Sequence, residues 1–280
     1  MSDSYKRWER ITGRWWFLAL LGLFSFVVPP YASKGFEWAQ VGSLIAHILQ
    51  HSLMTGWSAV YPFFQVAAVL FVLGVFFLRH RFGKIFSVYA ALSYLLFAAG
   101  QNISVTADYG TALLIVNIAM FSLVSAFWFW EAFLGYNDFS APPRSLWRYW
   151  VALPAVLAFW FPLNWDTLRP DFKLLYFLTS GSALTFCMMT PVFLAVLALY
   201  YPRVNLVTLR VTALVGLIIA FYNLLTNFVL EPALWWNGVL HLPLLVLSIY
   251  VLTLSQYFSK VLRPPLLTVD KQHQLGKNKK

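Results

Sequence analysis

The run LVTLRVTALVGLIIAFYNLLTNFVL, residues 206–230, is apolar along most of its length and carries one charged side chain, Arg210, close to its start. An α-helix rises about 1.5 Å per residue, so about 20 apolar residues cross the hydrocarbon core of a bilayer. Residues 206–230 are long enough to do so. The run therefore predicts a transmembrane helix.

Seven further apolar runs of comparable character occur in the chain. They comprise residues 15–31, 57–78, 85–105, 109–133, 147–163, 174–201 and 234–258. We predict an all-α fold, a polytopic transmembrane helical bundle of about eight spans that forms a single domain over residues 1–262. Residues 263–280 are polar and basic, and we predict a disordered cytoplasmic tail there.

The composition favours a membrane domain over a large soluble one. The chain is 60% hydrophobic and 11% charged, whereas soluble domains carry roughly 25% charged residues. So little charge cannot cover a water-facing surface, but a lipid-facing surface needs none. We therefore expect the lipid bilayer to be the main partner of this chain.

The basic residues predict the orientation in the membrane. A net charge of +10 would indicate nucleic-acid binding in a soluble protein, but here the charges flank apolar runs. All 20 Lys and Arg except Lys34, Arg169 and Lys173 fall in alternate segments on one side of the predicted bundle. The positive-inside rule assigns that side to the cytoplasm. We predict a multi-pass protein of the cell membrane with both termini inside and no nucleic-acid partner.

Residues 36–54, on the predicted outer side, are too polar to span a membrane. Their apolar residues recur at i, i+3, i+4 and i+7, a spacing that predicts one apolar helical face. Polar residues, His47 and His51 among them, lie on the other face. We predict an amphipathic helix that lies in the outer membrane interface. The apolar set is Val41, Leu44, Ile45, Ile48, Leu49 and Leu53.

Known catalytic and cofactor motifs are absent from the sequence. The predicted spans contain no lysine, which excludes a retinal Schiff base, and the chain has no P-loop, HExxH or aspartate-rich prenyl-diphosphate motif. His241 is the only histidine within a predicted span, so two bis-histidine haems are excluded. Cys187, the single cysteine, precedes Met188 and Met189, but consecutive helical residues point about 100° apart. We interpret that stretch as packing beside a kink at Pro191 rather than as a copper(I) site.

Polar side chains within the apolar runs are candidates for a substrate path. Asn223 and Asn227 share one helical face with Thr212, Gly216 and Ala220. One interpretation is a path lined by amides, and the other is ordinary helix packing through small residues and interhelical hydrogen bonds. We expect both amides to contact the sixth run near Thr185 or Thr190.

The fourth run supplies two more candidates for the path, Asn117 and Glu131. Glu131 is the one acidic residue that lies against a predicted span. It is either a hydrated carboxylate in the inner interface or an acid that couples transport to a proton or cation at the cytoplasmic mouth. The full set of path candidates is Asn117, Glu131, Thr185, Asn223 and Asn227.

Three histidines form a hypothetical metal site on the outer side. His47 and His51 are spaced i, i+4 and are therefore neighbours on a helix, and His241 begins the outer third of the last run. Three imidazoles within reach of one ion would bind zinc or copper. The alternative is that His47 and His51 simply form the polar face of the interfacial helix.

Three functional classes agree with these patterns. We favour a small-solute permease or ion-coupled transporter, because proline-interrupted spans and intramembrane amides suit transport and transport needs no dedicated motif. The alternative is a membrane-embedded enzyme or redox subunit that holds a metal ion, haem or quinone on the outer side. The third is an anchor subunit with a membrane-protein partner.

Overall fold

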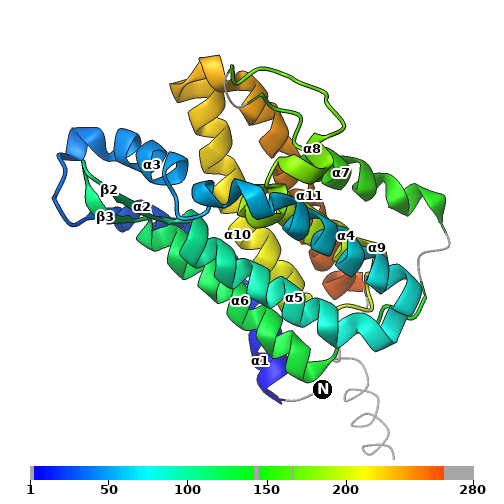
Figure 1. Ribbon diagram of the computed structural model, residues 1–280. Coiled ribbons are helices and arrows are strands. Elements are labelled where there is room, and N and C mark those ends of the chain that lie inside the picture. Colours follow the sequence, from blue (N-terminus) through cyan, green and yellow to red (C-terminus); the bar gives the residue numbers. More distant parts are fainter. Residues whose placement is uncertain (1–2, 142–144, 165–166, 262–280) are drawn as a thin grey trace, which may run out of the picture.

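The computed structural model describes residues 3–141, 145–164 and 167–261, with side chains described up to residue 256. The predicted basic tail, residues 263–280, lies outside the described residues. The fold is mostly helical (Figure 1). Its α-helices are α1 Asp3–Thr12, α2 Trp15–Val27, α3 Val41–Gln50, α4 Tyr61–Leu78, α5 Gly83–Leu96, α6 Ile115–Leu134, α7 Ala152–Trp160, α8 Tyr176–Thr179, α9 Phe186–Tyr200, α10 Leu206–Leu225 and α11 Trp235–Val261.

Shorter elements connect or extend these helices. Two π-helices, η4 Phe97–Gln101 and η7 Thr226–Leu230, continue α5 and α10. The 3₁₀ helices are η1 Trp38–Gln40, η2 Thr55–Val60, η3 Arg79–Phe82, η5 Leu146–Val151, η6 Ser182–Leu184 and η8 Pro232–Leu234. The strands are β1 Tyr31–Ala32, β2 Ile103–Thr106 and β3 Gly110–Leu113.

Helix α9 forms the centre of the bundle. Every one of its side chains except that of Val192 is buried. It packs against α7, α10 and α11. On its other side the Phe193 ring contacts Phe86 and Tyr94 of α5 and Trp128 of α6. An apolar helix surrounded on all sides belongs to the core of a membrane or large protein.

Helices α4 and α5 form an antiparallel hairpin. Helical residues follow one another without a gap from Thr55 to Gln101. At Arg79, between the two arms, φ is 54°, and the chain reverses direction there. The rings of Phe71 and Tyr89 then stack at 4.0 Å across the hairpin. At Gly74 a Cβ atom would come within 2.5 Å of the Phe82 ring, so glycine lets the two arms approach.

Several helices are long and apolar enough to cross a membrane, as a membrane protein requires. The part of the chain that the structure describes contains 4 such helical segments, or up to 5 if the bent pair Tyr176–Leu184 and Phe186–Tyr200 counts as one span. The 4 segments are Thr55–Gln101, Ile115–Leu134, Leu206–Leu230 and Pro232–Gln256. Each predicted run contains a helix, but α2 has 13 residues and α7 has 9. By length the helices therefore give fewer spans than the eight predicted.

A small sheet corrects the all-α prediction. The strands pair antiparallel in the order β1-β3-β2, with Ile103 opposite Leu113 and Thr106 opposite Gly110. The sequence predicts transmembrane helices over residues 85–105 and 109–133, and these two runs contain most of the hairpin. The β-branched residues of β2 favour an extended backbone, and Gly110 adopts φ +66°, which glycine tolerates. These local preferences end the third helix earlier than its apolar content predicts.

The predicted interfacial helix is shorter than residues 36–54 and packs on protein. In α3 the side chains of Leu44 and Ile48 are fully buried, and they form a cluster with Ala32, Ala112 and Leu114 of the sheet region. Figure 1 shows α3 lying across β2 and β3 at one end of the molecule. The main apolar face of α3 therefore covers the sheet rather than lipid, because the strands supply an apolar surface that the periodicity could not reveal.

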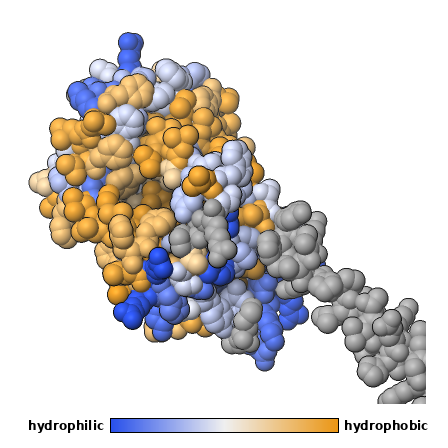
Figure 2. All heavy atoms as spheres, turned by 90° about the vertical axis from the view of Figure 1, so that its right-hand side faces the viewer, coloured by the Kyte–Doolittle hydropathy of each residue, from blue (hydrophilic) through white to orange (hydrophobic). Residues whose placement is uncertain are grey.

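The end of the bundle opposite the sheet gathers basic segments. Gly83 lies against the backbone oxygen of Asn137, whose side chain accepts a hydrogen bond from Asn205 N. Asp138 lies 3.7 Å from the Arg203 guanidinium. We call this end, where residues 79–84, 135–141, 201–205 and α1 meet, the basic end. Figure 2 shows a broad hydrophobic surface with hydrophilic residues gathered mainly above and below it.

Candidate functional site

The central helix is broken inside the bundle. The segments Tyr176–Leu184 and Phe186–Tyr200 meet at an angle of 90°. Gly181 adopts φ +71° and Thr185 has an extended backbone, so the chain leaves the helical conformation twice before α9 begins. We call residues 180–185 the break. Pro191, the predicted kink, lies within α9 instead.

A buried glutamine of α4 holds the break in place. Gln65 is 0% exposed, and its Nε2 atom donates hydrogen bonds of 2.8 Å to Ser180 Oγ and Ser182 Oγ. Its Oε1 atom accepts one of 3.1 Å from the backbone N–H of Ala183. Ser182 Oγ also donates to the backbone oxygen of Phe159 in α7. These bonds satisfy polar groups that would otherwise be costly to bury.

Gly181 is required at the break for two reasons. Its positive φ angle is disfavoured for residues with a Cβ atom. A Cβ atom there would also lie 2.7 Å from the ring of Tyr61, the first residue of α4. The ring therefore covers the glycine closely, and the break cannot accept a larger residue without rearrangement.

Amide side chains approach the first turn of α9. The backbone N–H of Phe186 donates to Gln101 Oε1 at 3.0 Å, and Asn223 Nδ2 lies 3.7 Å from Cys187 Sγ. Gln101 belongs to the π-helix η4, and Asn223 lies three residues before the π-helix η7. Such π-helical segments occur frequently at functional sites.

A chain of polar groups leads from Asn223 to α11. Asn227 Nδ2 donates to the backbone oxygen of Asn223 at 2.7 Å, and Asn227 Oδ1 accepts from Asn237 Nδ2 at 2.9 Å. The backbone oxygen of Asn237 lies 2.7 Å from His241 Nδ1. Asn227 and His241 are buried, at 3% and 6% exposure. Polar side chains thus connect the start of α9 with the start of α11.

The predicted stripe on α10 divides into two parts. Trp128 Nε1 donates to Thr212 Oγ1 at 3.0 Å, and Gly216 faces Leu244 and Ser248 of α11 closely, so this part serves helix packing. Asn223 and Asn227 form the polar part. Asn223 contacts α9 at Cys187 rather than at the expected threonines.

The other path candidates lie in different places. Thr185 belongs to the break and donates to the backbone oxygen of Ser182 at 3.1 Å. Asn117 donates to the buried Asn102 at 2.8 Å, beside the end of η4. Fourteen residues of α6 separate Asn117 from Glu131, about 21 Å along the helix axis. Glu131 is therefore not part of the same site.

Glu131 is buried and fully engaged at the basic end, so the expectation of a hydrated interfacial carboxylate is wrong. It is 1% exposed. Its Oε1 accepts from the backbone N–H of Asn137 and its Oε2 from Asn205 Nδ2, both at 2.6 Å. Asn205 in turn caps α10 by accepting from the N–H groups of Val207 and Thr208. The carboxylate thereby joins the end of α6 to the start of α10.

The three histidines do not assemble into a metal site. His47 and His51 stack with ring centroids 4.3 Å apart, and His47 Nε2 lies 3.0 Å from Thr106 Oγ1 in β2. His241 is engaged with Asn237 near the start of α11 instead. Among the described residues no group of three His, Cys, Asp or Glu side chains is placed to hold a metal ion. The i, i+4 spacing predicted the pair correctly, but it carried no information on the position of His241.

Sequence reasoning missed Gln65 and Gln101. Gln65 is the only amide within the apolar run 57–78, and that isolation was an available signal. Polar groups in hydrocarbon need partners, so a lone glutamine indicates a specific interhelical contact. Gln101 gave no such signal because it lies at the end of its run beside other polar residues.

Comparison with known proteins finds no relative of this chain. No protein-family model matches the sequence, and neither a curated protein nor a solved structure matches the chain.

Proposed function

We propose that this protein is a small-solute or ion-coupled transporter whose substrate site is the break before α9. The observation that carries the proposal is a discontinuous helix in the centre of the bundle, bent by 90° and held by the buried Gln65. Transporters commonly build their sites from discontinuous membrane helices near the middle of the bilayer.

The chemistry around the break favours a polar or anionic group of the solute. The start of α9 carries the partial positive charge of a helix N-terminus, and half-helix N-termini bind anionic substrate groups in known transporters. The amides of Gln101 and Asn223 lie beside the first turn of α9 and would orient the same group. A carboxylate or carbonyl on a small solute satisfies both requirements.

The proposal includes a multi-pass protein of the cell membrane with eight crossings and both termini in the cytoplasm. The contacts at the basic end support it, since loops that alternate along the chain meet there. Lys34, Arg169 and Lys173 belong to the remaining loops. The short helices α2 and α7 would cross with the help of flanking non-helical residues, and the exposed Leu20, Leu23 and Phe26 of α2 suit contact with lipid.

Solute flux into proteoliposomes tests the proposal. The purified full-length protein is reconstituted and challenged with small carboxylates, amino acids and inorganic ions, and charge movement and isotope uptake are recorded. We expect at least one solute to enter faster than in protein-free liposomes. Asn223→Leu should lower that flux at least tenfold, while Gln50→Leu on the exposed surface of α3 should not change it.

The same preparation distinguishes the enzyme alternative. A stoichiometric metal or a haem absorbance band, together with no flux for any solute in the panel, would contradict the transport proposal. Because the folded state is checked by size-exclusion chromatography in each preparation, loss of flux through unfolding is recognised separately.

A further inference from the structure

A basic cavity lies where α1 leads into α2. It has a volume of about 340 Å³ and is lined by Arg7, Arg10, Ile11, Arg14 and Trp16. Three arginines thus line it together with one isoleucine and one tryptophan. No acidic residue from the described part of the chain lines it, so the cavity is suited to an anion that also carries apolar groups.

The three arginines are exposed, and Arg10 Nε donates a hydrogen bond of 3.4 Å to the backbone oxygen of Lys6. Arg7 and Arg10 are spaced i, i+3 and lie on one side of α1, while Arg14 follows the end of α1 and directly precedes α2. The other side of the helix is docked on the bundle, where Tyr5 is buried and its hydroxyl accepts a hydrogen bond of 3.2 Å from Leu206 N. Within the described part of the chain none of the three arginines forms an ion pair with an acidic side chain.

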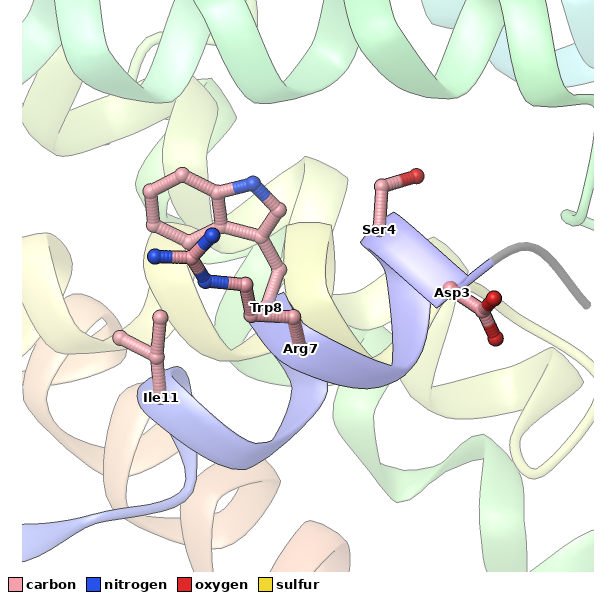
Figure 3. Close-up of a pocket in the computed structure, with 5 residues that line it drawn as sticks. All are labelled: Asp3, Ser4, Arg7, Trp8 and Ile11. Atoms are coloured by element: carbon pink, nitrogen blue, oxygen red, sulfur yellow. The ribbon is translucent and has the colours of Figure 1, made fainter.

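A second cavity of about 480 Å³ adjoins the first. Its lining residues are Asp3, Ser4, Arg7, Trp8 and Ile11. Figure 3 shows the Arg7 guanidinium next to the Trp8 indole and Ile11, while the Asp3 carboxylate lies at the far end of the group. Asp3 also lies 3.8 Å from Lys6 Nζ. The second cavity therefore adds apolar side chains beside Arg7. Its one acidic residue, Asp3, lies on the side away from Arg7.

The basic cavity lies at the level where a bilayer surface would begin. Trp15, the first residue of α2, is 81% exposed, and the exposed Leu20, Leu23 and Phe26 follow on the same helix. Tryptophan prefers the membrane interface, and exposed leucine and phenylalanine prefer the acyl region. A ligand in the cavity would therefore have cations on one side and hydrocarbon on the other.

We propose that this cavity binds the headgroup phosphate of an anionic phospholipid. The planar guanidinium groups match the oxygens of a phosphate and hydrogen-bond to them in pairs. Ile11 and Trp16 would contact the glycerol backbone and the first methylene groups of the acyl chains. A free phosphate ion would use only the arginines, so the apolar wall favours the lipid as the source. The proposal is independent of whether the protein transports a solute.

Thermal unfolding in detergent tests the site. The full-length protein is titrated with phosphatidylglycerol, with phosphatidylcholine, and with inorganic phosphate alone, and the melting temperature is recorded. We expect phosphatidylglycerol to raise it and the other two additives to leave it unchanged. With about 1 kcal/mol for each basic residue near an anionic surface, the triple variant Arg7→Gln, Arg10→Gln, Arg14→Gln should need on the order of 100-fold more phosphatidylglycerol for half of the rise.

Two control variants separate the site from general charge effects. The triple variant Arg79→Gln, Arg81→Gln, Lys84→Gln removes the same charge from the η3 region and should respond like the unmodified protein. The variant Arg7→Lys, Arg10→Lys, Arg14→Lys keeps the charge but loses the planar donor pairs, so its response should lie between those of the unmodified protein and the glutamine variant. An equal rise with inorganic phosphate would identify a phosphate site instead, and equal losses in both glutamine variants would show nonspecific attraction. Either result would overturn the proposal.

Discussion

Gln65 Nε2 in α4 lies 2.8 Å from Ser182 Oγ in the break before α9, and both side chains are buried. This contact joins two helices that are more than a hundred residues apart in sequence. It fixes the direction in which α9 enters the bundle. The candidate substrate site therefore depends on a single amide that faces three polar groups of one turn.

Gln65→Leu should destabilise the protein. The substitution removes the amide hydrogen bonds to Ser180 Oγ and Ser182 Oγ and leaves the backbone N–H of Ala183 unsatisfied. An unsatisfied buried group costs about 1–3 kcal/mol. We expect the free energy of unfolding in detergent to fall by about 3 kcal/mol. Gln50→Leu, at an exposed position of α3, should change it by less than about 0.5 kcal/mol. Equal stability of the two variants would show that the Gln65 contacts contribute little.

Gly181→Ala should also be destabilising. A Cβ atom at this position meets the Tyr61 ring at 2.7 Å, and φ is +71°. The left-handed conformation alone costs about 1–2 kcal/mol for alanine. Gly42→Ala in α3, where a Cβ atom meets nothing within 4 Å, should instead raise stability by about 0.5–1 kcal/mol. Thermal melts of both variants measure these changes. An unchanged melting temperature for Gly181→Ala would contradict the close packing of Tyr61 on Gly181.

Glu131→Gln should loosen the joint between α6 and α10. Both carboxylate oxygens accept hydrogen bonds at 2.6 Å, whereas a glutamine side chain has one acceptor oxygen and an NH₂ group that would face a donor. We expect a loss of about 1–3 kcal/mol in unfolding free energy. Glu37→Gln, at an exposed position, serves as the control. If transport is coupled to protons or cations, the Glu131 variant should also lose its coupling. Unchanged stability together with unchanged pH dependence of the flux would leave no role for the carboxylate.

The predicted topology can be tested by cysteine labelling. In a Cys187→Ala background, Asp108→Cys should react with an impermeant thiol reagent from outside and Arg144→Cys only from the cytoplasmic side. The same assignment places Arg81, Arg203 and Lys277 inside, and Asp171 and Glu231 outside. The physical reason is the concentration of Lys and Arg in alternate segments. Reaction of both cysteines from the same side would be incompatible with the eight-crossing arrangement.

The sequence predicted the helical character well, because long apolar runs without charge have few other stable forms. It did not predict the β2–β3 hairpin. Ile103, Val105 and Leu113 are apolar in either conformation, and the choice between helix and strand depended on neighbours such as Asn102, which hydrogen-bonds Phe97 O and Asn117.

The candidate site was predicted in part. Asn223, Asn227 and Thr185 lie at or near the break, as intramembrane polar groups should. The position of the break was not predicted. The sequence predicts a kink at Pro191, whereas the bend occurs at Gly181 and the extended Thr185. The joint histidine site failed because helical spacing carries no information about residues on other helices.

Accessibility of the break from water tests the central claim most directly. With Thr185→Cys in a Cys187→Ala background, an impermeant thiol reagent is applied from outside to the folded protein in liposomes, and the rate of modification is measured. We predict that the cysteine reacts and that a transported solute slows the reaction. A cysteine at residue 185 that stays unmodified, while one at residue 108 reacts in the same membranes, would mean that the break is sealed from water, and would contradict a transport site there.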